Sequence, residues 1–433
     1  MVSIGIRKED KNRWEARAPL TPEQVNELVS KGIDVYVETS DIRAFSDEDY
    51  RDAGATITDD LSSVPVVFGV KEMPSRYFVE GGTYIFFSHT IKGQKENMPM
   101  LQTLLDRDCN LIDYERIVDD KGRRLVFFGH YAGYAGMVDS LWALGKKLEH
   151  MGHSTAFGDV KKTIEYDGME GVRQGMKELG EKIENEGLPK EIKPLTIGFT
   201  GYGNVSQTAQ ELLDMLPHKE VSPKDIFDLD PEPDIIYKVV FKEEHMVEPN
   251  EPGRTFDLQE YYKHPERYHP VFSRYLPYLT VMVNCVYWEK RYPRLVTKER
   301  LSHLHNTDQE KLLVIGDITC DVEGAVECNT HVTTPGDPVY TYDPHHDKTE
   351  PGVQGEGPVI LAVDHLPCEL PRESTHEFGE LLKEFIPYIA EADYTLRIEE
   401  LNIPDEIKRA MVVYRGKLTP SYKYIQEYLE GGN

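Results

Sequence analysis

The chain has 433 residues, of which 49 are Lys or Arg and 76 are Asp or Glu, so its formal net charge at pH 7 is −27. Such a charge excludes nucleic-acid backbones and anionic membrane surfaces as partners. Hydrophobic residues make up 39% of the sequence and charged residues 29%, which is ordinary for a globular protein with a buried core. At about 100 to 200 residues per domain, the length favours two domains.

The first 135 residues alternate short apolar runs with helical patterns, which is typical of a parallel α/β sheet. A helix is predicted to begin at Pro22, with Thr21 as its cap, and to end before Gly32. The runs predicted to be strands are 2–6, 34–37, 64–70, 83–87, 111–114 and 125–128.

An ionisable side chain lies just past two of these strands, at the edge where parallel sheets place their chemistry: Lys71 and His89. A desolvated lysine has a lowered pKa and can act as a base, and a histidine titrates near neutrality and can act as an acid. A solvated loop lysine and a hydrogen-bonded histidine are the commoner alternative on spacing alone. By the same reasoning, Arg17 is more often a surface salt-bridge residue than a clamp for a carboxylate.

A long helix is predicted from Gly136, because apolar residues recur there at spacings of three and four up to Met151. We expect it to connect two domains. A new strand, Leu195–Thr200, then opens a second α/β unit. The segment 217–306 is rich in Pro, His, Tyr and acidic residues, and we interpret it as an insertion with loops.

The clearest local signal is the turn Gly201-Tyr202-Gly203 between this strand and a predicted helix. Strand, tight glycine turn and helix in this order favour a dinucleotide site. Gly201 permits the turn, Gly203 lets the backbone approach a pyrophosphate, and the helix N-terminus offers N–H groups to the anion. The third position of the motif is Ser206 instead of glycine, and an ordinary turn is the alternative.

The choice of dinucleotide is expected about 20 residues after the glycines, where an acidic side chain would bind the ribose 2′-hydroxyl of NAD. No acid closes the predicted strand cleanly there, and Ser222 with Lys224 could accommodate a 2′-phosphate. The pattern therefore favours NADP, with NAD as the alternative.

Further candidates follow the apolar run 312–314, where Asp317, Thr319 and Asp321 bring two carboxylates and a hydroxyl to the mouth of the second sheet. Contact with a cofactor and capping of a loop are equally consistent with them. The pair His345-His346 could bind a metal, but adjacent histidines rarely converge on one ion, so we favour a solvated loop and expect no metal.

Five cysteines, an odd number without a C-x-x-C pair, indicate neither a disulfide framework nor a zinc site. The N-terminal residues lack the apolar core of a signal peptide, and no apolar run reaches the roughly 18 residues of a membrane span. We therefore expect a protein of the reducing cytoplasm.

Taken together, several stretches resemble the lysine-ketoglutarate reductase half of the alpha-aminoadipic semialdehyde synthases, that is, lysine-forming saccharopine dehydrogenase, within the alanine dehydrogenase and transhydrogenase superfamily. These stretches are 7–20, 86–92, 111–115, 199–206, 364–367, 370–373 and 422–426. The resemblance implies an α/β fold with two Rossmann-like domains, parallel sheets and an active-site cleft between them. Residues 1–136 and 370–433 would form the substrate domain, and 137–369 the dinucleotide-binding domain with its insertion at 217–306.

The resemblance also implies the reaction: interconversion of saccharopine with L-lysine and 2-oxoglutarate by means of NADP or NAD. Because the chain ends where the animal bifunctional enzyme continues, we expect it to perform only this first step. The alternatives are an amino-acid dehydrogenase of the alanine type and a catalytically silent NADP-binding regulator. A homo-oligomer is compatible with the family.

The implied site residues fall into four groups. The catalytic pair is Lys71 and His89, and the residues expected to bind substrate are Arg17, Lys71, Gln94 and Phe128. Lys92 and Glu115 are expected to tune the catalytic pair. The motif and the resemblance together give these cofactor-binding candidates: Arg123, Gly201, Tyr202, Gly203, Ser222, Val283, Asn284, Asp317, Thr319 and Asp321.

Overall fold

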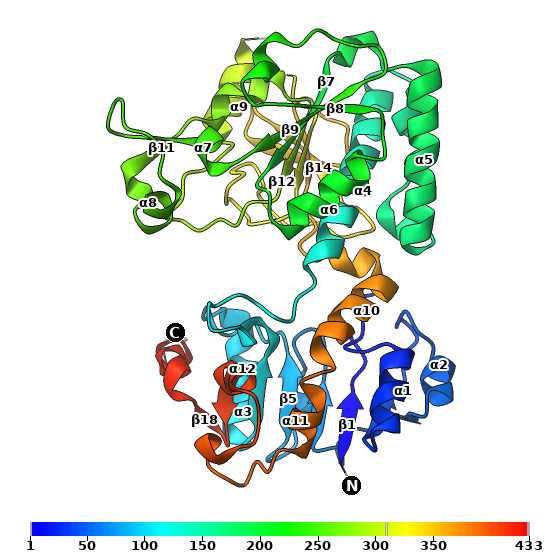
Figure 1. Cartoon of the computed structure of the whole chain (residues 1–433), viewed down its shortest axis with the longest axis vertical. Helices are drawn as coiled ribbons and strands as arrows, with labels where there is room; N and C mark the ends of the chain where they lie inside the picture. The colour runs from blue at the N-terminus through cyan, green and yellow to red at the C-terminus, as the bar shows by residue number, and fades with distance from the viewer. Residues whose placement is uncertain (1, 308, 310, 431–433) are drawn as a thin grey trace. The chain divides into compact units, whose positions relative to one another are not determined.

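The computed structural model describes residues 2–307, 309 and 311–430, and the chain divides into two compact units (Figure 1). Unit 1 consists of Met1–Phe128 and Pro371–Asn433, and unit 2 consists of Gly129–Leu370. The first boundary lies at the start of the long helix, whereas the sequence suggested residue 136, inside that helix.

An eight-stranded sheet forms the centre of unit 1, in the order β18-β17-β6-β5-β4-β1-β2-β3. All pairs from β1 to β6 are parallel, and β17 is antiparallel to both of its neighbours. The strands are β1 (Ser3–Ile6), β2 (Asp34–Glu38), β3 (Thr56–Thr58), β4 (Val66–Phe68), β5 (Thr83–Phe86), β6 (Asn110–Asp113), β17 (Met411–Tyr414) and β18 (Lys417–Leu418).

The strand predicted at 125–128 is wrong. These residues form no strand, because the edge beside β6 is occupied by β17 from the C-terminal part of the chain. The preceding segment folds back as a short loop with a single bridge between Val118 and Arg124. An apolar run thus covers the core without joining the sheet, a distinction that periodicity alone does not make.

The first predicted helix is confirmed as α1 (Pro22–Ser30). Thr21 Oγ1 accepts the N–H of Gln24, and the Gln24 side chain accepts the N–H of Thr21, which closes a capping box. Gln24 also donates to His376 O of α10 (Pro371–Leu382), which explains why this late helix belongs to unit 1. The other α-helices of unit 1 are α2 (Asp47–Asp52), α3 (Met98–Asp106), α11 (Ile386–Glu391), α12 (Asp405–Ala410) and α13 (Gln426–Glu430).

Unit 2 contains a second eight-stranded sheet, in the order β15-β14-β16-β13-β12-β7-β9-β8. The pairs from β8 to β16 are parallel, and β14 is antiparallel to β15 and β16. The strands are β7 (Leu195–Thr200), β8 (His218–Val221), β9 (Ile236–Phe241), β12 (Val281–Asn284), β13 (Val314–Asp317), β14 (Val339–Asp343), β15 (Lys348–Pro351) and β16 (Val359–Leu361). The expected α/β class with two mainly parallel sheets is confirmed.

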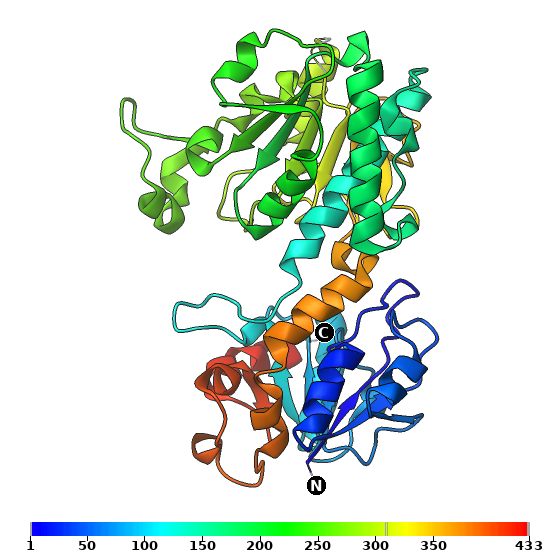
Figure 2. The same ribbon diagram turned by 45° about the vertical axis from the view of Figure 1, so that its right-hand side comes forward.

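The interpretation of the segment 217–306 as an insertion is wrong, because this segment supplies three strands of the sheet, including β9 and β12 on either side of β7. What extends from the sheet is the two-stranded β10 (Val247–Pro249) and β11 (Tyr268–Pro270) with α8 (Leu258–Lys263), which project from the body of unit 2 in both views (Figures 1 and 2). The remaining α-helices of this segment are α7 (Glu243–Met246) and α9 (Lys298–Asn306).

The long predicted helix is α4 (Gly129–His150), which begins seven residues before Gly136. It packs against α6 (Asn204–Leu213), and Gly133 makes the close approach possible: a Cβ there would lie 2.1 Å from Thr208 Oγ1. Thr208 donates to His130 O at 2.8 Å across this contact. Another long helix of unit 2, α5 (Gly168–Glu186), runs beside the sheet (Figure 2). Within the described part of the chain, each helix is too short or too polar to cross a membrane.

Two carboxyl groups face each other in the core of unit 2, Asp139 on α4 and Glu369 at the end of the unit. Both side chains are fully buried, and Asp139 accepts bonds from the Thr163 N–H and hydroxyl at 2.8 and 2.9 Å. Burial and the neighbouring Asp139 carboxylate raise the pKa of Glu369 well above its ordinary value, and burial also raises the pKa of Asp139, although a hydrogen bond with Glu369 acts to lower it. The pair therefore favours a protonated state in the folded protein.

We predict that Glu369→Gln removes a loss of stability at higher pH. Because the folded pKa exceeds the unfolded one, the folded chain binds more protons from about pH 4.5 upward, and its stability falls as pH rises through that window. Between pH 5 and pH 8, the free energy of unfolding of the variant, measured by thermal unfolding, should rise relative to that of the parent by about 1 kcal/mol or more. The exposed Glu356→Gln is the control, and parallel pH slopes for parent and Glu369→Gln would contradict the prediction.

Candidate active site

The two candidate acid and base residues lie on adjacent loops of unit 1. Lys71 follows β4 and His89 follows β5, and these strands pair in parallel. Because the carboxyl ends of parallel strands meet at one edge, both residues emerge at the same edge of the sheet. The predicted strand-end placement of Lys71 and His89 is what the structure shows.

A buried ion pair, Arg7 with Glu9, holds the backbone at Lys71. The Glu9 carboxylate accepts the N–H groups of Val70 and Lys71 at 2.7 and 3.0 Å, while Arg7 donates to the carbonyls of Lys71 and Glu72 at 3.3 and 3.0 Å. Both side chains are inaccessible, with exposed fractions of 0% and 2%. The sequence did not single out Arg7 or Glu9, because a charged run after a strand usually lies in solvent.

Gly69 provides the space for this clamp. A Cβ at position 69 would lie 2.9 Å from Arg7 Nε and 2.9 Å from Met73 Cε, closer than real contacts allow. A larger residue at position 69 would require the Arg7 and Met73 side chains to shift, so glycine leaves room for the guanidinium in the position where it bonds to the backbone.

The surroundings of Lys71 make it a stronger candidate base than an ordinary lysine. Burial lowers the pKa of its ammonium group, and the positive charges of Arg17 and Lys11 lower it further. Glu15 and Glu72 act in the opposite direction without reversing the result. A neutral amine is therefore accessible at a lower pH than for a solvated lysine.

Arg17 is a buried residue, contrary to the surface role that its sequence context favoured. Its guanidinium makes a two-point ion pair with Glu15 at 2.6 and 2.7 Å, and its side chain is 3% exposed. The same group lies 4.3 Å from the ring centre of Phe128, which in turn stacks on Phe378 of α10 at 4.1 Å. The structure thus brings Arg17 and Phe128 together and shows Glu15 as a partner that the sequence analysis missed.

His89 is held through Glu72. Its Nδ1 lies 2.6 Å from Glu72 Oε1, and Lys11 Nζ lies 2.9 Å from the other carboxylate oxygen. Burial alone would raise the pKa of Glu72, but His89 and Lys11 outweigh it and lower that pKa to about 2. His89 itself has a left-handed backbone, with φ of 48°, which is uncommon for a residue with a side chain.

The other predicted residues of unit 1 have local partners. Gln94 Oε1 accepts the N–H of Lys92 at 3.2 Å, Glu115 pairs with Arg124, and Arg123 pairs with Asp119 at 2.7 Å. Lys92 and Arg123 are exposed. Their roles as tuning, substrate or cofactor residues stay predictions.

The glycine turn of unit 2 fits the pyrophosphate of a dinucleotide. Gly201 has φ of +88° and donates its N–H to Phe241 O at 2.9 Å, and Ser206 Oγ donates to Gly201 O at 2.8 Å. Gly203 caps α6 without a side-chain hydrogen bond, and a Cβ built on it would meet nothing within 4 Å. The turn opens on a cavity of about 440 Å³ lined by Gly201, Tyr202, Gly203, Glu243, Met246, Tyr261, Tyr262, Cys285, Val286, Tyr287, Trp288, Tyr292, Pro293 and Leu295.

Four of the predicted cofactor residues belong to the sheet interior or its edge network. Asn284 accepts from Thr200 Oγ1 at 2.7 Å and donates to Asp317 at 2.8 Å and to Thr319 at 2.9 Å, and Val283 is buried in β12. Asp317 also accepts from Asn329 at 2.8 Å, and burial raises its pKa despite these bonds. The network ties the ends of β7, β12 and β13 together. Asp321, in contrast, is exposed.

Ser222 lies after β8 at the edge of the sheet, where its hydroxyl donates to Asp225 at 2.7 Å. Since β9 separates β8 from β7, Ser222 does not follow the strand next to the glycine turn. Ser222, which the motif spacing predicted to choose between NAD and NADP, therefore lies one strand farther from the glycine turn than that spacing assumes.

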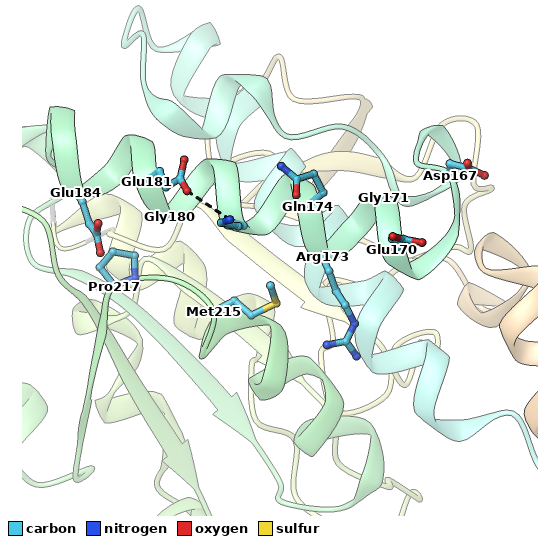
Figure 3. Close-up of a pocket in the computed structure, with 11 residues that line it drawn as sticks. Asp167, Glu170, Gly171, Arg173, Gln174, Gly180, Glu181, Glu184, Met215 and Pro217 are labelled. Atoms are coloured by element: carbon cyan, nitrogen blue, oxygen red, sulfur yellow. Dashed lines mark ion pairs between the residues drawn. The ribbon is translucent and has the colours of Figure 1, made fainter.

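A larger cavity, of about 860 Å³, lies along α5 (Figure 3). Acidic side chains such as Glu170 and Glu184 line it, together with Arg173 and a Lys177–Glu181 ion pair of 4.0 Å. It contains none of the predicted site residues.

The candidate metal residue His346 pairs with Asp343 at 2.7 Å. Among the described residues there is no group of three or more His, Cys, Asp or Glu that could hold a metal ion.

Comparison with known proteins places the chain in a class. Residues 5–135 match the family described as alanine dehydrogenase/PNT, N-terminal domain. Among solved structures, an L-alanine dehydrogenase aligns over 100% of both chains with a TM-score of 0.62 and 16% identity. A transhydrogenase from Sinorhizobium meliloti aligns over 96% of this chain and 100% of its own, with a TM-score of 0.56 and 14% identity. The chain thus has the fold of the alanine dehydrogenase and transhydrogenase superfamily.

Sequence relatives narrow this class. The chain is 38% identical over 98% of its length to alpha-aminoadipic semialdehyde synthase of Arabidopsis thaliana and 34% identical over 99% to the mitochondrial enzyme of that name in Rattus norvegicus. It spans 41% and 48% of those proteins. It is also 26% identical, over 88% of its length and 90% of the relative, to an NAD-linked, lysine-forming saccharopine dehydrogenase of Yarrowia lipolytica. The chain belongs to the alpha-aminoadipic semialdehyde synthase family, as its resemblance indicated.

We predict that Asp317 is needed for the stability of unit 2. Asp317→Ala leaves buried donors on Asn284 and Asn329 without an acceptor, which should lower the free energy of unfolding by about 3 kcal/mol. The exposed Asp321→Ala should change it by no more than about 0.5 kcal/mol. Equal unfolding midpoints in urea for the two variants would contradict the structural role of Asp317.

Proposed function

We propose that the chain is an oxidoreductase that interconverts saccharopine with L-lysine and 2-oxoglutarate, using a nicotinamide dinucleotide. The observation that carries the proposal is the half-buried Lys71, whose pKa is lowered by desolvation and by the charge of Arg17, on the same sheet edge as His89. The names of the relatives supply the substrate class, and the glycine turn supplies a place for the dinucleotide.

In the oxidative direction, saccharopine, water and oxidised dinucleotide give lysine, 2-oxoglutarate and reduced dinucleotide. Saccharopine loses a proton from its secondary amine and a hydride from the adjacent glutamyl carbon, which forms an imine. Water adds to the imine to give a carbinolamine, and its C–N bond breaks to release lysine and 2-oxoglutarate. Oxidised dinucleotide accepts the hydride, and one proton is released overall. At least two titratable groups are needed for these proton transfers.

Lys71 and His89 are proposed to supply those two groups. Lys71, whose neutral form is favoured by burial and by Arg17, would take the proton from the secondary amine. His89, oriented by Glu72 through its Nδ1, would move protons to and from the carbinolamine. Arg17 is a guanidinium of the kind that binds carboxylates, of which saccharopine carries three, and a substrate carboxylate would share Arg17 with Glu15, which it pairs with in this structure.

The dinucleotide is proposed to lie on the Gly201-Tyr202-Gly203 turn. The backbone N–H groups at the start of α6 would hold its pyrophosphate, and the open space at Gly203 would admit it. The nicotinamide supplies hydride acceptance and donation when bound. The cytoplasmic location and the homo-oligomer stay predictions, as does restriction to this single step.

We predict that the purified chain, given lysine, 2-oxoglutarate and either NADH or NADPH, oxidises the reduced dinucleotide, which is seen as loss of absorbance near 340 nm. Ammonia in place of lysine, or pyruvate in place of 2-oxoglutarate, should not support turnover. Turnover with pyruvate and ammonia alone would favour the alanine-dehydrogenase alternative, and dinucleotide binding without any turnover would favour a silent regulator.

Substitutions separate the proposed roles in the same assay. Lys71→Met and His89→Gln should each lower kcat by about 10²- to 10⁴-fold, because each removes a proton-transfer group. The exposed Lys31→Met is a matched control in unit 1 and should leave kcat unchanged. Unchanged kcat in Lys71→Met would reject its assignment as the base.

A further inference from the structure

The position that reads the dinucleotide's adenosine ribose is displaced in this fold. In a dinucleotide-binding sheet, that side chain follows the strand that lies next to the glycine-turn strand. Here the strand after α6, β8, lies at the sheet edge, and the neighbour of β7 is β9. β7 and β9 pair along six residues, from Leu195 with Ile236 to Thr200 with Phe241, and the bond from Gly201 N–H to Phe241 O extends the pairing.

The residues after β9 therefore occupy the place next to the glycine turn. They are Lys242 and Glu243, the latter 40 residues after Gly203 in the sequence. Glu243 lines the same cavity as Gly201, Tyr202 and Gly203. The usual spacing of about 20 residues points to Ser222 instead, which lies one strand farther out and bonds to Asp225.

Two tyrosines hold the Glu243 carboxylate at the cavity. Tyr262 donates its hydroxyl to Glu243 Oε1 at 2.6 Å. Burial and the nearby Glu243 carboxylate raise the pKa of Tyr202, which keeps that hydroxyl protonated. Lys242 is exposed, does not line the cavity, and lies with its Nζ 5.8 Å from the Tyr202 ring centre. The charged group that faces a bound ribose is thus the carboxylate of Glu243.

We propose that Glu243 selects NAD over NADP by accepting a hydrogen bond from the ribose 2′-hydroxyl and repelling a 2′-phosphate. A hydroxyl donates to a carboxylate, whereas a phosphate monoester carries a charge of about −1.5 to −2 and only accepts. This inference rests on the proposed dinucleotide site at the glycine turn. It reverses the preference for NADP that Ser222 and Lys224 suggested.

Equilibrium binding tests the proposal without turnover. Trp288 lines the cavity, so titration with NADH or NADPH can be followed by its fluorescence and checked by calorimetry. The parent should bind NADH at least about 10-fold more tightly than NADPH, the ratio expected for one hydrogen bond to a charged group. Glu243→Ser should weaken NADH binding and tighten NADPH binding, so that the ratio falls to about one or inverts.

Three controls distinguish the possible failures. The exposed neighbour Glu244→Gln and the edge variant Ser222→Ala should leave the ratio unchanged. Gly203→Val, whose side chain enters open space at an ordinary φ of −75°, should fold normally and lose both nucleotides. Tighter NADPH binding by the parent, or an unchanged ratio in Glu243→Ser, overturns the role of Glu243. In either case, loss of binding in Gly203→Val still tests whether the dinucleotide lies on the glycine turn. If neither nucleotide binds the parent, the dinucleotide site itself is rejected.

Discussion

The buried Arg7–Glu9 ion pair is the interaction on which the unit 1 site depends. Removing two charges from water costs several kcal/mol each, and such a pair is tolerated only where further hydrogen bonds satisfy both groups. Here those bonds go to the backbone at Val70, Lys71 and Glu72, so the pair fixes the main chain at the candidate base. The side chain of Lys71 is half-buried beside this clamp, and its desolvation lowers its pKa.

The overall charge of −27 and the character of this site are opposite in sign but compatible. Net charge acts on large partners approaching the surface, whereas a pocket is governed by the groups that line it. At this sheet edge Arg7 and Arg17 are buried and Lys71 is half-buried, and the two arginines are each matched to a neighbouring carboxylate. An acidic exterior therefore does not prevent the site from accepting a ligand that carries carboxylates, because Arg17 and Lys71 lie inside.

Sequence periodicity predicted the parts of the fold that depend on local signals. The capped helix 22–30, the glycine turn at 201–203 and the strand ends before Lys71 and His89 all follow from neighbouring residues. Sheet order does not, because it depends on pairings between distant segments. For that reason the apolar run 125–128 is predicted as a strand although β17 pairs with the edge beside β6. For the same reason β9 and β12, which lie within a polar segment, are not predicted as strands. Glu9 and Glu15 were missed because nothing in a sequence marks a carboxylate as buried, and Glu72 was missed because its pairing with His89 depends on the fold. Glu243 was missed because a motif spacing assumes the usual strand order.

The folded unit 1 holds Lys71 as an ammonium group that loses its proton more easily than a solvated lysine does. Carbon-13 NMR of protein labelled at the lysine side-chain ε position measures this directly, with Lys71→Arg assigning the signal. Lys71 is expected to titrate below the ordinary lysine value of 10.5, and Arg17→Met is expected to raise its pKa, since a neighbouring positive charge is removed. A Lys71 signal that titrates at or above 10.5 and does not respond to Arg17→Met would contradict it.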